Sequence, residues 1–404
     1  MLKRPDDWTA RRLLLEAVSP VAVEKVPLWE TGGRVLAQDV IARENIPPFD
    51  RSPYDGYAFR SADSVGAGQM CPVTLRVLET VPAGSVPTAV VTEGTAIKVL
   101  TGAPIPEGAD AVIPYEQTAF TAETVTLFAP VPEGSNRVAA GEDVKKGAVL
   151  ARRGTMVDPG LAGTLAAQGI SAPEVFQIPR IGVLSVGNEL TEGTAPLAPG
   201  KIRDSNRAAL GTLIRAMGCA CVDLGIVGDS AEAISERLQA GLSECDAVIS
   251  TGGVSVGDYD LVPKAMERIG IRLLFRGAEL KPGMACAYGL YGEKLICGLS
   301  GNPASALTNF YVIALPALRK LMGHSEPLPR QIRVRLLEDF PKRSPVSRFL
   351  RGTLTLEDGV AGMRLSGAQG NVVLSSAVGC NVMARIPAGS GPVAAGKELE
   401  AFLI

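Results

Sequence analysis

A glycine-rich turn is the part of this sequence whose residue types point most clearly to binding chemistry. Residues 250–260 read Ser-Thr-Gly-Gly-Val-Ser-Val-Gly-Asp-Tyr-Asp and connect an apolar run to a predicted helix. Glycines let backbone N–H groups come close to an anion, and a helix start adds partial positive charge, so we expect phosphate binding here. The turn matches neither the P-loop nor the dinucleotide-binding fingerprint, and an ordinary strand-to-helix turn stays open as the alternative.

A second turn of the same kind lies at residues 299–305, Leu-Ser-Gly-Asn-Pro-Ala-Ser. Asn302 is suited to cap a helix and Pro303 to occupy its first position, as they would in any protein. A single long helix is predicted to follow, over residues 303–322. The two turns together would place two helix N-termini at one edge of a sheet, where free N–H groups favour anions.

Carboxylates follow three separate predicted strands, at Glu189, Asp229 and Asp260. Mg²⁺ takes oxygen ligands, often one or two carboxylates together with substrate phosphates, so these side chains favour a shared acidic site for that ion. Asp229 taken alone would be interpreted as a helix cap. Two cations, Arg276 and Lys281, lie beyond a further strand, where they could hold an oxyanion or belong to a solvated turn.

The composition excludes several classes of protein. Lys and Arg number 40 and Asp and Glu 42, which gives a formal charge of −2 and no basic surface of the kind that binds nucleic acid. The single histidine, His324, excludes multi-histidine metal sites, and the seven cysteines include no CxxC pair. No apolar run reaches the roughly 18 residues of a membrane helix, and the first residues lack the apolar core of a signal peptide, so we expect a cytoplasmic protein.

The elements that must position these residues follow from hydrophobic periodicity. The middle of the chain alternates between strands and helices, which predicts a largely parallel, doubly wound sheet with ligands beyond the carboxyl ends of its strands. A β-rich stretch separates two helical stretches before it, and the end of the chain alternates like the strands of a small β domain. The predicted domains are a split N-terminal mixed α domain (1–45 plus 141–177), a β-rich insert (46–140), an α/β domain (178–323) and a C-terminal β domain (324–404).

Together, several stretches of the chain resemble one family, the molybdopterin molybdenumtransferases, which comprise bacterial MoeA and the gephyrin E domain. The resemblance is specific because the stretches keep the order of the family and span nearly the whole chain. They are residues 52–58, 101–111, 141–143, 185–190, 204–206, 251–260, 281–283, 301–303 and 349–352.

The resemblance implies an α/β multidomain fold. A β-rich insert domain would interrupt the mixed α domain, and the central doubly wound α/β domain would bind molybdopterin and be MogA/MoaB-like. A C-terminal β-barrel domain would close the chain. The resemblance also implies an elongated homodimer, whose active site combines the α/β domain of one subunit with the N-terminal region of the other.

The implied activity is a magnesium-dependent step of molybdenum cofactor biosynthesis. Adenylylated molybdopterin meets molybdate, AMP leaves, and molybdenum stays bound to the dithiolene of the pterin. Phosphate, pyrophosphate and molybdate are all anions, so such a site needs amides, cations and a metal. The resemblance makes contacts with the adenylyltransferase that supplies the substrate and with recipient molybdoenzymes possible. The charge balance and the short apolar runs predict neither a nucleic acid nor a membrane as a partner.

The resemblance also implies roles for individual residues. The positions that match the family's catalytic polar and acidic residues are Asp55, Thr101, Asp143, Glu189, Asp229 and Asp260, of which the last three would hold Mg²⁺. The positions that match its molybdopterin- and nucleotide-binding residues are Gly252, Gly253, Ser255, Gly257, Asn302 and Pro303. The positions that match its molybdate-binding residues are Arg276, Lys281, Arg351 and Asn371.

Three residues depart from the family pattern: Asn188 where Asp is usual, Ser300 where Pro is usual, and Asn371 where Ser is usual. Asn188 removes a negative charge near the predicted metal, and the departures leave the choice between molybdate and tungstate open. Two other functions stay open on the sequence alone. One is ATP-dependent adenylyl transfer to molybdopterin, against which the two β-rich blocks argue. The other is a non-enzymatic carrier of the finished cofactor.

Overall fold

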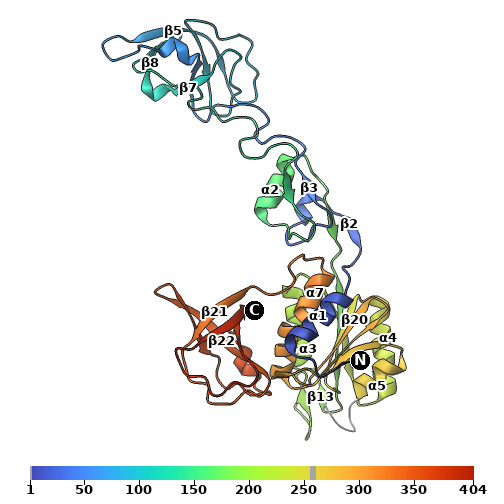
Figure 1. Cartoon of the computed structure of the whole chain (residues 1–404). Helices are drawn as coiled ribbons and strands as arrows, with labels where there is room; N and C mark the ends of the chain where they lie inside the picture. The colour runs from blue at the N-terminus through green and yellow to red at the C-terminus, as the bar shows by residue number, and fades with distance from the viewer. Residues whose placement is uncertain (1, 255–260) are drawn as a thin grey trace. The chain divides into compact units, whose positions relative to one another are not determined.

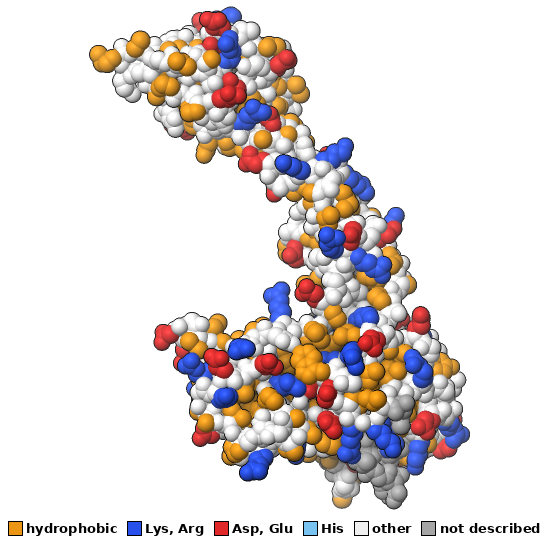
Figure 2. Space-filling view, viewed as in Figure 1, with side chains coloured by type: hydrophobic (Ala, Val, Ile, Leu, Met, Phe, Trp, Pro, Cys, Tyr) orange, Lys and Arg blue, Asp and Glu red, His pale blue; other side chains and the backbone are white. Residues whose placement is uncertain are grey.

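The structure is a computed structural model that describes residues 2–254 and 261–404 (Figure 1). The chain divides into two compact units. One unit combines residues of 1–38, 153–158 and 172–404, and the other combines 39–152 and 159–171. On the face shown in Figure 2, basic and acidic side chains are interspersed over both units, in keeping with the near-zero net charge.

A seven-stranded sheet forms the centre of the first unit, in the order β1-β17-β19-β20-β16-β12-β15. The four strands β15, β12, β16 and β20 run parallel, as the strand–helix alternation predicts, whereas β19 is antiparallel to both β20 and β17. Since β15 and β16 flank β12 on opposite sides, the chain changes direction across the sheet at β12, and ligands bind at such switch points. The strands are β1 (Leu2–Lys3), β12 (Arg180–Val186), β15 (Ala220–Val227), β16 (Ala247–Thr251), β17 (Arg272–Arg276), β19 (Cys286–Tyr291) and β20 (Lys294–Leu299).

Helices cover both faces of this sheet because successive side chains of a strand point to opposite sides. Ile181 and Val183 of β12 belong to a core shared with α1, α3, α6 and α7, whereas Leu184 and Val186 belong to a core shared with α4 and α5. Figure 1 shows α4 and α5 on the opposite side of the sheet from α1 and α3. The helices are α1 (Asp7–Ala17), α3 (Asn206–Ala216), α4 (Ala231–Glu244), α5 (Leu261–Arg268), α6 (Pro303–Asn309) and α7 (Leu315–Leu321).

The long helix predicted over residues 303–322 is not one uniform α-helix. A π-helical segment, η4 (Phe310–Ala314), separates α6 from α7. Pro316 follows this segment and has no backbone N–H, so the preceding turn lacks one ordinary helical donor. A π-helical register accommodates such an interruption without ending the helix, and π segments often occur near functional sites.

The C-terminal strands close into the predicted barrel. They pair in the order β22-β23-β21-β25-β24, and β24 returns to pair with β22, so the sheet has no free edge between them. Gly352 of β22 pairs with both β23 and β24, and an added Cβ there would lie 2.4 Å from the carbonyl oxygen of Arg364. The barrel strands are β21 (Gln331–Leu336), β22 (Ser347–Glu357), β23 (Val360–Leu365), β24 (Val382–Ile386) and β25 (Glu398–Leu403), and β18 (Leu280–Lys281) adds to β22.

The second unit contains a six-stranded sheet, β7-β4-β6-β5-β9-β8, around a core that includes Tyr57, Phe59 and Leu75. Its other elements are the β3–β10 pair and α2 (Pro159–Ala167). Two short strands of the first unit, β2 (Val23–Lys25) and β11 (Glu174–Phe176), pair antiparallel. The remaining strands are β3 (Val40–Ile41), β4 (Gly56–Phe59), β5 (Val73–Val81), β6 (Thr95–Val99), β7 (Ala111–Pro114), β8 (Thr118–Phe120), β9 (Thr124–Leu127), β10 (Val149–Ala151), β13 (Leu190–Thr191) and β14 (Ile202–Arg203).

Candidate functional site

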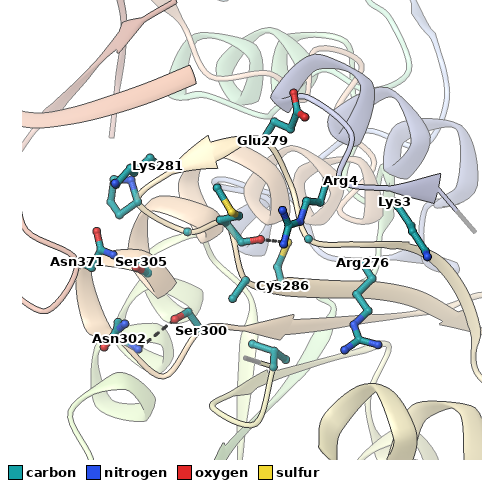
Figure 3. Close-up of a pocket in the computed structure, with 16 residues that line it drawn as sticks. Lys3, Arg4, Arg276, Glu279, Lys281, Cys286, Ser300, Asn302, Ser305 and Asn371 are labelled. Carbon is teal, nitrogen blue, oxygen red and sulfur yellow. Dashed lines mark hydrogen bonds between the residues drawn. The ribbon is translucent and has the colours of Figure 1, made fainter. Parts of the chain in front are cut away.

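A cavity of about 810 Å³ lies in the first unit, where β20, β17 and β1 end (Figure 3). Both predicted turns contribute to it, through Val254 after β16 and through Ser300 and Asn302 after β20. Among the described lining residues, the charged side chains are four cations and a single carboxylate, so the cavity suits an anion. They are Lys3, Arg4, Arg276, Lys281 and Glu279.

The glycine-rich turn begins as the sequence predicts. Gly252 has φ +91°, and an added Cβ would lie 2.1 Å from the carbonyl oxygen of Val186, so no other residue fits the turn unchanged. Gly253 also has a positive φ, of +65°. Ser255, Gly257 and Asp260 lie outside the described residues.

Asn206, at the start of α3, connects the two turns through hydrogen bonds. Its side-chain amide donates to Thr251 Oγ1 and to the carbonyl oxygen of Gly301, each at 2.8 Å. The hydroxyl of Thr251 in turn donates to the carbonyl oxygen of Ser300 at 3.0 Å. The sequence singled out residues 204–206 without assigning Asn206 a role, since its partners lie 45 and 95 residues further along the chain.

The two described acidic residues lie on adjacent loops at the carboxyl ends of β12 and β15. The N–H of Gly187 donates to the carbonyl oxygen of Val227, and Asn188 and Asp229 exchange two hydrogen bonds of 3.0 and 3.1 Å through backbone N–H and side-chain oxygen. The carboxylate of Glu189 folds over Gly187, where an added Cβ would lie 2.3 Å from its Oε2. Within residues 2–254 and 261–404 no three His, Cys, Asp or Glu side chains cluster as a metal site.

Two carboxylates are nevertheless a fitting donor set for Mg²⁺, which usually binds through one or two carboxylates and completes its shell with water and substrate phosphates. Asp229 has an oxygen that is not engaged by the Asn188 N–H, and Asn188 supplies a neutral side-chain oxygen beside it. The residues present therefore suit an ion that is bound together with a phosphorylated ligand.

Strand pairing and buried hydrogen bonds hold the segment that contains Lys281. It belongs to β18, which pairs with β22 of the barrel, with Lys281 opposite Arg348. Behind it, the hydroxyl of Tyr288 donates to Asn309 Oδ1, and Asn309 Nδ2 donates to the carbonyl oxygen of Gly283 at 2.8 Å. Burial raises the pKa of Tyr288, so the phenol stays protonated and remains a donor.

Cys286, which also lines the cavity, is not set up as a nucleophile or metal ligand. Burial raises the pKa of its thiol to about 12, so the thiolate is not formed near neutral pH.

In the second unit, Asp55 and Thr101 form one constellation. The backbone N–H and the hydroxyl of Thr101 both donate to Asp55 Oδ1 at 2.7 Å. These hydrogen bonds lower the pKa of Asp55, and the bond from the backbone N–H of Thr101 has the larger effect. Asp143 is exposed, and its backbone N–H donates to the carbonyl oxygen of Ile46.

Several known proteins are similar to this chain. Three family models match consecutive parts of the chain: "MoeA N-terminal region (domain I and II)" over residues 8–169, "Probable molybdopterin binding domain" over 182–320 and "MoeA C-terminal region (domain IV)" over 333–404. Molybdopterin molybdenumtransferases of Staphylococcus epidermidis and Staphylococcus aureus are 35% and 34% identical over 380 and 381 residues, covering 94% of this chain and 90% of each relative. The chain belongs to the molybdopterin molybdenumtransferase family. It is an enzyme of molybdenum cofactor biosynthesis.

Solved structures agree with this assignment. The crystal structure of the molybdopterin biosynthesis MoeA protein from Pyrococcus horikoshii OT3 matches with a TM-score of 0.85 and 34% identity, over 99% of this chain and 100% of that one. A second Pyrococcus MoeA structure matches with a TM-score of 0.83 and 29% identity, over 99% of both chains. The predicted α/β multidomain fold with a C-terminal β-barrel is therefore confirmed. No helix among the described residues is long and apolar enough to span a membrane.

Of the four residues predicted to bind molybdate, Arg276, Lys281 and Asn371 line the cavity, whereas Arg351 is not among its lining residues. The side chain of Arg351 is buried and donates to Ser376 Oγ at 2.9 Å and to the carbonyl oxygen of Gly370 at 3.3 Å. Burial lowers the pKa of this guanidinium. In the structure described, Arg351 thus supports the segment that carries Asn371.

The structure adds two cations that the sequence analysis did not identify, Lys3 and Arg4. They were missed because β1 is a two-residue strand, too short to show a period, and is defined only by its pairing with β17. Pro303 follows the cavity-lining Asn302 at the start of α6, as predicted.

Proposed function

We propose that this enzyme transfers molybdenum from molybdate to the dithiolene of adenylylated molybdopterin, in a magnesium-dependent reaction that releases AMP. The observation that carries the proposal is the four-cation cavity lined in part by two glycine-containing turns, at the same edge of the sheet as the two acidic loops that follow β12 and β15. Such an edge can hold several anionic groups at once, because it supplies amide donors, cations and carboxylates for a divalent ion.

In this proposal each group of residues has a separate task. The turn at Gly252 and Gly253 holds the phosphate of the pterin through the N–H of Gly253, because the N–H of Gly252 donates to the carbonyl oxygen of Leu299 at 3.0 Å. Lys281 and Asn371 hold molybdate. Glu189 and Asp229, with Asp260 outside the described residues, would hold Mg²⁺, and a bound ion would supply positive charge next to the phosphoanhydride. The charge on Lys281 then favours an oxyanion over a neutral ligand.

We extend the proposal to Asp55, Thr101 and Asp143, and to a homodimer. Asp55 is kept ionised by the two donors of Thr101, which suits a group that orients a water molecule or an ion. Mixing inactive Asp55→Ala and Lys281→Ala variants tests a shared active site. About half of the dimers in an equimolar mixture would be mixed, and each mixed dimer would have one intact site of two, so the mixture would regain up to about a quarter of the wild-type activity. An unchanged lack of activity after subunit exchange would contradict the composite site.

The reaction is tested by incubating the protein with adenylylated molybdopterin, molybdate and Mg²⁺ and measuring released AMP. Glu189→Ala is expected to lower AMP release by at least tenfold. Glu244→Ala is the matched control, because this carboxylate lies at the far end of α4, pairs with Arg180 at the start of β12 and is 65% exposed. AMP release at equal rates from the wild type and Glu189→Ala would refute the proposal, as would formation of adenylylated molybdopterin from ATP instead.

A further inference from the structure

The N-terminal strand β1 brings two basic side chains to the anion cavity. Leu2 and Lys3 pair in parallel with Phe275 and Arg276 of β17. The pairing continues beyond the strand, because the N–H of Arg4 donates to the carbonyl oxygen of Arg276 at 3.1 Å. The backbone therefore determines where Lys3 and Arg4 lie, whatever their side chains are.

Arg4 has a backbone conformation that is unfavourable for its type. Its φ is +49°, in the left-handed region where glycine is preferred. Its stem passes over Gly277, where an added Cβ would lie 2.9 Å from Arg4 Cγ. A strained residue that is not glycine points to a role for its side chain, since glycine at this position would relieve the strain.

Figure 3 shows two groups of polar side chains in the cavity. Lys3, Arg4 and Arg276 lie on one side, and Lys281 and Asn371 lie on the other. The single lining carboxylate, Glu279, points away from the turn at Ser300 in this view. Among the described residues, no carboxylate forms an ion pair with Lys3 or Arg4, so their charge acts on whatever enters the cavity.

We propose that Lys3 and Arg4 form, together with Arg276, an oxyanion-recruiting rim that raises the affinity of the cavity for its tetrahedral oxyanions. The inference rests on the proposed function, and it adds specificity-determining residues from the N-terminal strand. Clefts lined by one sign of charge concentrate counter-ions and accelerate their association, and this effect weakens as ionic strength rises. The oxyanion is either molybdate or the phosphate of the adenylylated substrate, and the two sources respond to different titrations.

The test uses the full chain with Lys3→Ala combined with Arg4→Gly. Glycine suits the backbone of residue 4, so this change removes the cation without removing a favourable conformation. Arg4→Lys in the wild-type background keeps the charge and is expected to retain affinity. Arg12→Ala is the matched control, because Arg12 belongs to the adjoining helix α1 and is 70% exposed.

Two affinities are measured for each variant at low and at moderate salt: the Kd of molybdate by calorimetry and the Kd of adenylylated molybdopterin by fluorescence. The double variant is expected to weaken one or both by roughly tenfold and to reduce their salt dependence. A change confined to one ligand identifies the oxyanion. If both Kd values stay within about twofold of the wild type, the inference is overturned. It is also overturned if Arg12→Ala weakens binding as much as the double variant does. Because binding is measured directly, a wild type that binds but releases no AMP would refute only the proposed reaction.

Discussion

Replacing Asp7 with Asn should destabilise the first unit far more than a similar change at Glu16, near the other end of the same helix. Asp7 is the first residue of α1 and is fully buried. It accepts from Arg11 at 2.6 Å within the same helix and from Arg385 of the barrel at 3.1 Å. This cluster therefore joins the helix that follows β1 to the barrel that carries Asn371, and so connects two walls of the cavity.

The expected loss of unfolding free energy follows from the burial of Arg11 and Arg385. The side chain of Arg11 is 6% exposed and that of Arg385 is 19% exposed, so loss of Asp7 leaves two poorly solvated guanidinium groups without their counter-charge. Breaking a buried pair by removing one partner costs about 3–5 kcal/mol, and we expect about 3 kcal/mol because Arg385 also donates to Ser347. Arg12 and Glu16 form a pair of the same spacing, but with exposures of 70% and 67%, so Glu16→Gln should cost under about 0.5 kcal/mol.

Trp8 provides a local assay for this cluster. The guanidinium of Arg11 lies 4.3 Å from its ring centroid and that of Arg385 lies 5.8 Å away. The chain has two tryptophans, and the other, Trp29, is 99% exposed, so a Trp29→Phe background leaves Trp8 as the sole reporter. Urea unfolding followed by Trp8 fluorescence then gives the free-energy difference. Equal destabilisation by Asp7→Asn and Glu16→Gln, within about 0.5 kcal/mol, would show that the argument from burial is wrong.

Three further predictions concern the candidate site. Gly252→Ala forces a Cβ against the carbonyl of Val186, so kcat/KM for AMP release should fall roughly a hundredfold while the circular dichroism spectrum stays that of the wild type. Asn206→Ala removes two hydrogen bonds and should lower the free energy of unfolding in urea by about 2 kcal/mol. Thr101→Val removes one donor to Asp55, whose lowered pKa should rise in an NMR titration. Since that pKa is lowered, the interaction stabilises the fold above the ordinary value of about 3.8 and is lost as the pH falls through the folded-state value, and an unchanged pKa would contradict the assignment.

The local pattern of apolar and helix-capping residues was sufficient to predict much of the fold. The alternation of apolar runs with capped helices predicts the parallel strands and their helices, because burial on both faces and helix capping are properties of neighbouring residues. Ser230 illustrates this point, since its hydroxyl accepts from the N–H of Ala233 at the start of α4 and caps the helix in place of the neighbouring Asp229. The π segment at Phe310 was not predicted, because a proline within a helical pattern does not say how the turn before it will adjust.

Residue types along the chain were enough to identify the available chemistry: glycines at the turns after buried strands, carboxylates at Glu189 and Asp229, and the cation at Lys281. The three-dimensional arrangement was needed to show which of these groups share one cavity, that Lys3 and Arg4 also line it, and that Arg351 is buried and supports the segment that carries Asn371. The physical reason is that turn and cap preferences act over a few residues, whereas strand order and barrel closure depend on pairing between distant segments, such as β1 with β17 and β22 with β24.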